Sequence, residues 1–372
     1  MRRMTRLKAL NKSTRNNIIV LGIILVIYVI CRILMAAGAM SNLMQGLLVP
    51  LCYYSILAIS LNLTVGILGE LSLGHAGFMC IGAFMGAFFT KCTENSISNV
   101  FIRYGIAMLL GAVCAALFGG LIGVVVLRLR GDYLAIVTLA FGEIVKNIIN
   151  ALYVGIDNKG LHISLQDAAA LKLAEGGEVI VNGAKGITGT SRDTTFTVAI
   201  LMLILVYFII VNLINSRSGR AIMAIRDNRI AAESVGIDIT RFKLLAFTIS
   251  AAMAGIAGVL YSHNISSLVA TPKNFGYNMS IMILVFVVLG GVGNIRGSIV
   301  AAVILTLLPE YLRFLADYRM LIYAVVLIVM MIFNWNPACI AWRKNHPIKG
   351  VLQSVIKKKE GSASGKEGGK AS

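Results

Sequence analysis

The sequence predicts an all-α fold, a polytopic bundle of about eight to ten transmembrane helices with broken or re-entrant segments. Two observations predict this class. Of the 372 residues, 58% are apolar and only 13% are charged, whereas a soluble domain carries about 25% charged residues. Runs of about 20 apolar residues, long enough to cross the hydrocarbon layer, recur from residue 17 to residue 336. A β-barrel would instead show alternating strands of about ten residues.

Ten apolar segments are predicted to be spans. They cover residues 17–36, 45–63, 74–91, 104–127, 132–152, 196–214, 242–261, 277–291, 298–312 and 320–336. A basic tail, 1–16, precedes the transmembrane region 17–336, and a basic, disordered tail, 337–372, follows it. The first run has the basic and small-residue flanks of a signal peptide. It is longer than a usual signal core, so we expect an uncleaved span.

The placement of lysine and arginine predicts the orientation. With the N-terminus in the cytoplasm, the inside segments hold 23 of these residues and the outside segments hold nine. This asymmetry is typical of cytoplasmic loops, so we expect both termini on the cytoplasmic side of a bacterial inner membrane. Eight spans with re-entrant segments fit as well as ten. The net charge of +18 then serves orientation and contact with lipid headgroups, and no nucleic acid partner is expected.

Two glycine-rich segments interrupt the apolar runs. The broken segment, residues 62–77, reads NLTVGILGELSLGHAG, and the glycine hairpin, residues 290–297, reads GGVGNIRG. Irregular backbone at membrane depth is tolerated only inside protein or beside a water-filled cavity, so both segments are candidates for lining a transport pathway. The alternative is that they are ordinary surface loops beside helices packed closely at Gly82/Gly86 and Gly255/Gly258.

Five polar residues near these segments are the candidate pathway residues. They are Asn62, Ser72, His75, Glu143 and Lys146. The first three supply hydrogen-bonding groups in the broken segment, although His75 could instead close the helix break. Glu143 and Lys146 are three residues apart on one predicted span, where an isolated charge costs about 2.5–3.5 kcal/mol. They are expected to neutralise each other, and either border the pathway or fix two helices together.

No motif for catalysis or for a bound cofactor is present. The chain has no P-loop, no GxSxG, and neither the CxxC nor the HExxH spacing of a metal site. We therefore expect that the chain is not an enzyme and binds no cofactor or metal.

The basic segment 215–243 is predicted to contain a helix from Arg220 to Val235. One face is made of small residues at helical spacing, and Arg229 and Glu233 are placed to pair at i, i+4. Gly236 stands where a helix C-cap belongs. A helix on the membrane surface usually carries bulky apolar residues, which this face lacks, so docking on a partner protein is favoured over that alternative.

Four strings carry a resemblance to a known family. The string GRAIMAIRDNRIAAESVGIDITRFKLLAFTISAAMAGIAGVLY resembles the coupling-loop region of branched-chain amino acid ABC-transporter permeases, specifically the M-type subunit of the leucine/isoleucine/valine uptake system. The strings LNLTVGILGELSLGHAGFMCIGAF, RLRGDYLAIVTLAFGEI and VFVVLGGVGNIRGSIVAAVIL resemble other motifs of that family. They occur in the expected order over most of residues 55–335.

The resemblance implies an import permease that forms its pathway with a second homologous permease subunit. Two cytoplasmic ABC ATPases, which hold ATP and Mg, would dock on the coupling loops of the two permeases, 215–243 in this chain, and an external solute-binding protein would deliver the substrate. The implied ATPase-coupling residues are Arg220, Arg226, Arg229, Glu233 and Gly236.

Related permeases are associated with urea or short amides. An ion-coupled secondary transporter and a membrane scaffold without transport remain as alternatives from other classes. The polar external segment 153–195 departs from the family pattern, and either contacts the binding protein or is a solvated loop.

Overall fold

The computed structural model describes residues 12–94, 96–129, 131–157, 160–173, 177–312 and 318–335. Seven helical segments in this part of the chain are long and apolar enough to cross a membrane, which confirms the predicted helical membrane bundle. The chain divides into two compact units, Met1–Leu307 and Leu308–Ser372. The predicted tail 337–372, and residues 1–11 of the predicted tail 1–16, lie outside the described residues.

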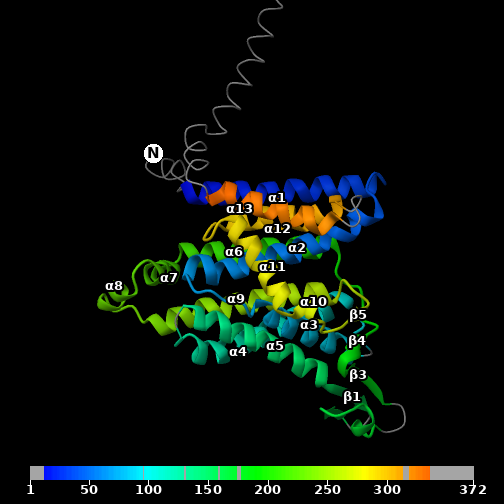
Figure 1. The fold of residues 1–372 in the computed structure, drawn as a ribbon. Coiled ribbons are helices and arrows are strands. Elements are labelled where there is room, and N and C mark those ends of the chain that lie inside the picture. Colours follow the sequence, from blue (N-terminus) through cyan, green and yellow to red (C-terminus); the bar gives the residue numbers. More distant parts are fainter. Residues whose placement is uncertain are drawn as a thin grey trace, which may run out of the picture. The chain divides into compact units, whose positions relative to one another are not determined.

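Each predicted span overlaps one of the helices in Figure 1. In the first unit these are α1 (Lys12–Ala36), α2 (Asn42–Asn62), α3 (His75–Cys92), α4 (Val100–Val126), α5 (Asp132–Ala151), α6 (Phe196–Asn215), α9 (Ile239–Ser262) and α11 (Tyr277–Gly290). The helix α12 (Ile295–Tyr311) crosses the boundary between the units, and α13 (Arg319–Trp335) belongs to the second unit. Shorter helices are α7 (Arg217–Asp227), α8 (Arg229–Ser234) and α10 (Pro272–Phe275).

The core of the first unit forms around α9, which packs against α2, α3 and α4. Close approach of α3 and α9 depends on small residues, because a Cβ atom added to Gly82 would lie 2.4 Å from the Cα atom of Gly255. The hydrophobic effect does not favour association of helices in lipid, because lipid tails are as apolar as the side chains. Van der Waals contact at small residues therefore supplies much of the attraction between helices. Close helix packing at these glycines was part of the alternative interpretation of the sequence, although the partner of each glycine was not specified. Phe78 and Phe247 fill the adjacent core with an edge-to-face ring contact.

Both predicted helix breaks are present. The helix α2 continues into a π-helical turn, η2 (Leu63–Leu68), which ends at Gly69 in the left-handed region with φ +81°. Residues 69–74 have no regular structure, and α3 begins at His75. The glycine hairpin connects α11 to α12 with φ +93° at Gly291 and φ +81° at Gly293. Glycine occupies such backbone conformations without the steric cost that other residues incur.

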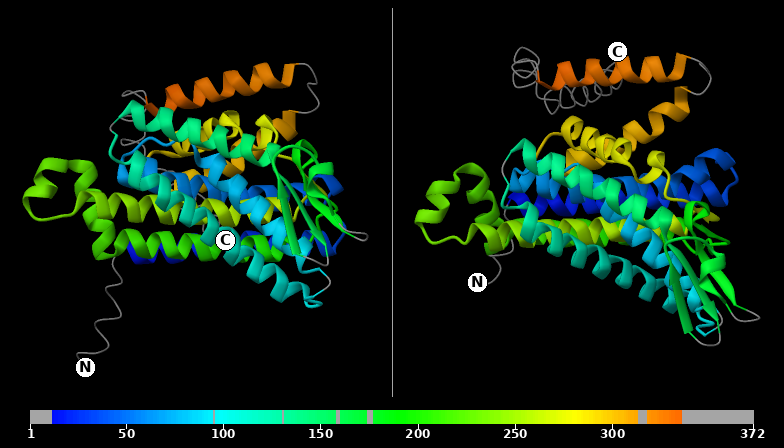
Figure 2. Two further views of the ribbon diagram at one scale, coloured as in Figure 1. Left: turned by 90° about the horizontal axis from the view of Figure 1, so that it is seen from below. Right: turned by 60° about the horizontal axis from the view of Figure 1, so that its bottom comes forward.

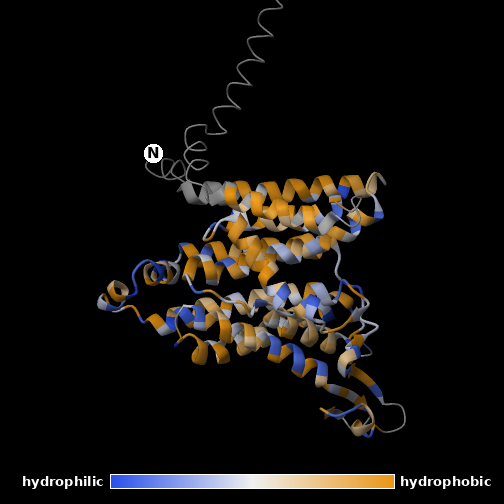
Figure 3. Ribbon diagram, viewed as in Figure 1, coloured by the Kyte–Doolittle hydropathy of each residue, from blue (hydrophilic) through white to orange (hydrophobic). Residues whose placement is uncertain are grey.

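The predicted external loop 153–195 contains a small sheet. Three antiparallel strands in the order β2-β1-β3 form it, namely β1 (Tyr153–Asp157), β2 (Gly160–Ser164) and β3 (Glu178–Asn182). A second pair joins β4 (Ile187–Thr188) to β5 (Ser267–Leu268). This sheet lies at one end of the first unit, and α7 and α8 lie at the opposite end in both orientations (Figures 1 and 2). The helices between them are mainly hydrophobic, and both ends include many hydrophilic residues (Figure 3).

Candidate functional site

The broken segment is in direct contact with the loop 215–243. Arg226, at the end of α7, donates a hydrogen bond of 2.8 Å from Nη1 to the carbonyl oxygen of Gly66 in η2. Its Nε and Nη2 atoms donate to Asp227 Oδ1 at 3.1 and 2.9 Å. The aliphatic part of Arg226 covers Gly69, where an added Cβ would lie 2.6 Å from Arg226 Cγ. The sequence predicted Arg226 as a coupling residue, but not this contact.

A second cation holds the other end of the break. Lys243 in α9 forms an ion pair with Glu70, which directly follows Gly69, and both side chains are largely shielded from solvent. Between the two polar attachments an apolar cluster joins Leu63, Ile67 and Leu68 of η2 to Ile222 of α7 and Ala246 of α9. The break is therefore fixed to both α7 and α9.

Asn62 joins the two glycine-rich segments. Its Oδ1 atom accepts a hydrogen bond of 2.9 Å from the amide of Gly293, and its Nδ2 atom donates at 2.8 Å to Ser298 Oγ on α12. Gly66 leaves the space for this contact. An added Cβ there would lie 1.9 Å from Asn62 Oδ1 and 2.2 Å from the Gly293 nitrogen.

The other two candidate pathway residues of the broken segment are also buried. His75 Nε2 is 2.7 Å from Ser60 Oγ, a hydrogen bond that bridges the break. Ser72 Oγ has no hydrogen-bond partner among the described residues. Asn62, Ser72 and His75 are at most 2% exposed, so in this conformation they contact protein and not solvent.

Glu143 and Lys146 form the predicted ion pair on α5. Glu143 Oε1 also accepts a hydrogen bond of 2.8 Å from the amide of Tyr277, the first residue of α11. A carboxylate at a helix N-terminus is stabilised by the helix dipole. The pair therefore connects α5 to α11, and the burial of Lys146 is compensated by its partner.

The predicted single helix from Arg220 to Val235 is wrong. The chain leaves helical geometry at Asn228, with φ −155° and ψ 106°, and Asn228 Oδ1 caps α8 by accepting from the amide of Ala231 at 3.1 Å. Asparagine is among the preferred N-cap residues, and this local bond outweighs the helical periodicity. The predicted small-residue face is consequently divided, because Ile225 and Ala232 are buried whereas Val235 is 75% exposed. Outside that face, Ile222 is buried and Ile230 is 81% exposed.

The remaining predicted coupling residues lie at the ends of these helices. Arg220 donates at 3.1 Å to the carbonyl of Asn215. Arg229 and Glu233 form no ion pair in the part of the chain that the structure describes. Gly236 has φ +82° and ends α8 as predicted, because its amide bonds to Glu233 and the next amide bonds to Ala232.

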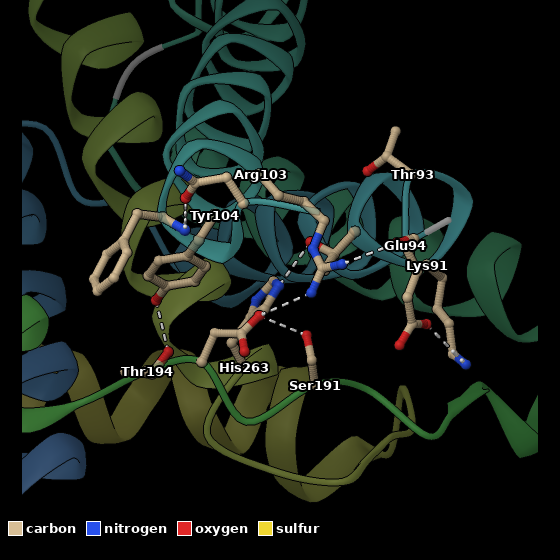
Figure 4. Close-up of polar contacts among 12 residues, drawn as sticks. Lys91, Thr93, Glu94, Arg103, Tyr104, Ser191, Thr194 and His263 are labelled. Carbon is tan, nitrogen blue, oxygen red and sulfur yellow. Dashed lines mark hydrogen bonds and ion pairs between the residues drawn. The ribbon is translucent and has the colours of Figure 1, made fainter. Parts of the chain in front are cut away.

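A polar cluster at the opposite end of the unit was not predicted. Arg103 of α4 pairs with Asp193, with Nη2 and Oδ2 3.7 Å apart, and Ser191 donates to Asp193 at 2.7 Å. Figure 4 shows Arg103, Ser191 and His263 close to one another. His263 Nε2 is 2.8 Å from Thr90 Oγ1, and burial lowers the pKa of His263. The cluster attaches the end of the external segment to α3, α4 and α9. The signal in the sequence that could have indicated this cluster is the presence of polar residues at the ends of neighbouring predicted spans.

Comparison with known proteins places this geometry in context. The family described as branched-chain amino acid transport system, permease component, matches residues 42–333. The high-affinity branched-chain amino acid transport system permease protein LivM of Salmonella typhimurium is 35% identical, over 89% of this chain and 76% of its own length. LivM of Escherichia coli is also 35% identical, over 84% and 72% respectively.

A more distant relative covers the same region. The probable branched-chain amino acid transport permease protein LivM of Methanocaldococcus jannaschii is 27% identical, over 84% of this chain and 96% of its own length. No solved structure matches the chain.

Proposed function

This chain belongs to the family of permease components of branched-chain amino acid transport systems, and from that premise we propose that it is a membrane-spanning subunit of an ATP-driven importer for branched-chain amino acids. The match extends from residue 42 to residue 333 and includes all the helices between α2 and α12. Both similar LivM proteins carry this transport activity in their names.

The connection between the loop 215–243 and the broken segment carries the proposal. An importer driven by a separate ATPase needs an exposed docking element that is attached to the helices around its pathway. The helices α7 and α8 project from the unit (Figure 1) and present the exposed apolar side chains of Ile230 and Val235. The hydrogen bond from Arg226 to Gly66 links this element to the break inside the bundle.

We assign the partners on the same basis. Two ATPases with ATP and Mg dock at the cytoplasmic face on the coupling loops of the two permeases, which is 215–243 in this chain, with the coupling role assigned to Arg220, Arg226, Arg229, Glu233 and Gly236. A second homologous permease completes the pathway, and a solute-binding protein delivers the amino acid at the end that carries the sheet. Both termini are cytoplasmic, as the distribution of basic residues supports.

The pathway itself is assigned to the surroundings of the broken segment. Rearrangement of η2 uncovers Asn62, Ser72 and His75, which offer hydrogen bonds to the carboxylate and ammonium groups of the substrate. Glu143 and Lys146 border the same region, because α5 approaches α3 so closely that a Cβ added to Gly77 would lie 2.8 Å from the Gly142 Cα atom.

Reconstitution tests the function directly. The chain, its partner permease and the ATPases are placed in liposomes with the binding protein outside, and uptake of radiolabelled leucine, isoleucine and valine is measured. We expect uptake that requires ATP and saturates with leucine, and little uptake of urea or acetamide. Uptake that persists without ATP and is abolished by an ionophore would instead identify an ion-coupled transporter.

Substitution of an exposed apolar side chain on α8 tests whether the ATPase docks there. We expect Ile230→Asp to lower co-purification of the ATPase by about tenfold, since removing a central apolar contact costs more than about 1 kcal/mol at an interface. Leu161→Asp on β2 is the matched control, because Leu161 is an exposed apolar residue at the opposite end. Equal co-purification of both variants with the wild type would contradict docking at α8.

A further inference from the structure

The side chain of Arg226 is 38% exposed, but its Nη1 atom reaches the broken segment of its own chain. We propose that Arg226 is a positioning residue, which transmits movement of α7 and α8 to the π-helical turn η2 and the glycine hairpin, rather than a docking residue for the ATPase. This inference rests on the proposed function, because it assumes a motor that moves the loop 215–243. It assigns docking to one set of side chains in that loop and transmission to another.

The donors of Arg226 support this division. The guanidinium group carries five N–H groups, and three of them are engaged within the chain: Nη1 is bonded to Gly66, and Nε and Nη2 are bonded to Asp227. These bonds hold Arg226 against η2. The large apolar side chains that face outward in this loop are those of Ile230 and Val235, on the far side of the helix break at Asn228.

The acceptor of Arg226 is an element suited to two conformations. Single π-helical turns are rare inside α-helices and frequently occur at functional sites. The turn η2 continues directly from α2 and ends in the left-handed region at Gly69, so tightening it to α-helical geometry shifts everything that follows. A charge-assisted hydrogen bond to the Gly66 carbonyl favours the π-helical state. Withdrawal of the Arg226 side chain removes that preference.

The contacts beyond Gly66 carry the movement to a second helix. Gly66 packs directly against Gly293, whose amide bonds to Asn62, and Asn62 bonds to Ser298 on α12. A displacement of η2 therefore moves the glycine hairpin as well. The ion pair of Glu70 with Lys243 holds the far end of the break on α9. Between these attachments η2 can pivot, with Arg226 on the moving side and Lys243 on the fixed side.

The test separates transmission from docking. In proteoliposomes containing the complete transporter, we expect Arg226→Gln to retain ATPase co-purification while leucine uptake per ATP hydrolysed falls about tenfold, the ratio expected for one charged hydrogen bond. Arg226→Lys, which keeps one donor for Gly66, should recover part of the ratio. Arg128→Gln is the matched control for uptake, because Arg128 is an exposed arginine outside the loop 215–243, and it should leave the ratio unchanged. Arg217→Gln, at the exposed arginine in the first position of α7, is the control for the exchange experiment, which uses the chain alone.

Hydrogen exchange on the purified full chain gives a second readout that needs no partner. Arg226→Gln should speed exchange of amides in residues 63–74 at least about fivefold, with no change in the α4 peptide 100–126, and Arg217→Gln should change neither. Loss of ATPase co-purification in Arg226→Gln, or an unchanged uptake ratio with unchanged exchange, would overturn the inference. A wild-type complex without ATP-dependent uptake would instead refute the proposed function, and the exchange result would still stand.

Discussion

Asn62 binds the amide of Gly293, 231 residues further along the chain, through a hydrogen bond of 2.9 Å. The same side chain donates to Ser298, so one buried amide fixes the broken segment to the glycine hairpin and to α12. We expect Asn62→Ala to lower the free energy of unfolding by about 2–4 kcal/mol, because two buried groups lose their partner. Thermal unfolding of the purified chain in detergent measures this.

Ser298→Ala is the informative companion, because it leaves the bond from the Gly293 amide to Asn62 intact and removes only the acceptor for Asn62 Nδ2. We expect an intermediate loss of stability. If Asn62→Ala unfolds at the wild-type temperature, Asn62 does not hold the two segments together.

Gly66 tolerates very little additional volume. A Cβ there meets the side chain of Asn62 and the backbone of Gly293 at 1.9 and 2.2 Å. The backbone of Gly293 cannot easily move away from an added methyl group. We therefore expect Gly66→Ala to abolish uptake and to reduce the amount of folded protein. Gly105→Ala on α4 is the control, since nothing lies within 4 Å of its added Cβ. It should be neutral or stabilising by about 0.5–1 kcal/mol. Normal uptake by Gly66→Ala would mean that this contact is not required.

The ion pair of Glu143 and Lys146 is tested by a double-mutant cycle. Lys146→Met removes the cation, and Glu143→Gln leaves the buried Lys146 ammonium unpaired. We expect the free energy of unfolding to fall by about 1–3 kcal/mol in each single variant. This loss is smaller than that caused by breaking a fully buried pair, because Glu143 is partly exposed. The double variant should recover most of this loss. Recovery of leucine uptake along with stability would assign the pair to helix fixation and exclude a direct role in transport.

The stability of the external polar cluster should depend on pH. Burial lowers the pKa of His263 from its ordinary value of 6.5, an effect that Arg103 reinforces and Asp193 opposes. The unfolded chain therefore binds a proton near pH 6.5 that the folded chain does not bind. This contribution lowers stability as pH falls below about 6.5 and is absent at higher pH. Unfolding temperatures between about pH 5 and pH 8 should show this slope, and His263→Gln should reduce it. A wild-type slope of opposite sign would contradict the assignment.

The membrane spans and helix breaks were predictable from sequence because they depend on local composition. Glycines at 69, 291 and 293 indicated where helices end, and those ends occur there. What joins the breaks was not predictable. The partners of Asn62, Arg226 and Glu70 come from distant spans, and no local pattern specifies which helices become neighbours.

The errors near the two ends of the unit have local causes. The single helix predicted over 220–235 failed because Asn228 was treated as a helical residue, although its side chain can cap a new helix. The sheet in 153–195 escaped prediction because its strands are only two to five residues long, too short for alternation to be distinct. Arg103 and Asp193 were assigned to separate external segments. They meet because Thr194, next to Asp193, is bonded to the end of α9, and α4 packs against α9.

The two ion pairs along the spans have an electrical consequence. Glu70 with Lys243, and Glu143 with Lys146, each sum to zero charge. A membrane potential does work of about 2.3 kcal/mol on each elementary charge that crosses 100 mV. A pair that moves as a unit presents no net charge to that field, so rearrangement of the break is not opposed or assisted by voltage through these groups. Movement of these two pairs in the proposed cycle therefore adds no dependence on membrane voltage.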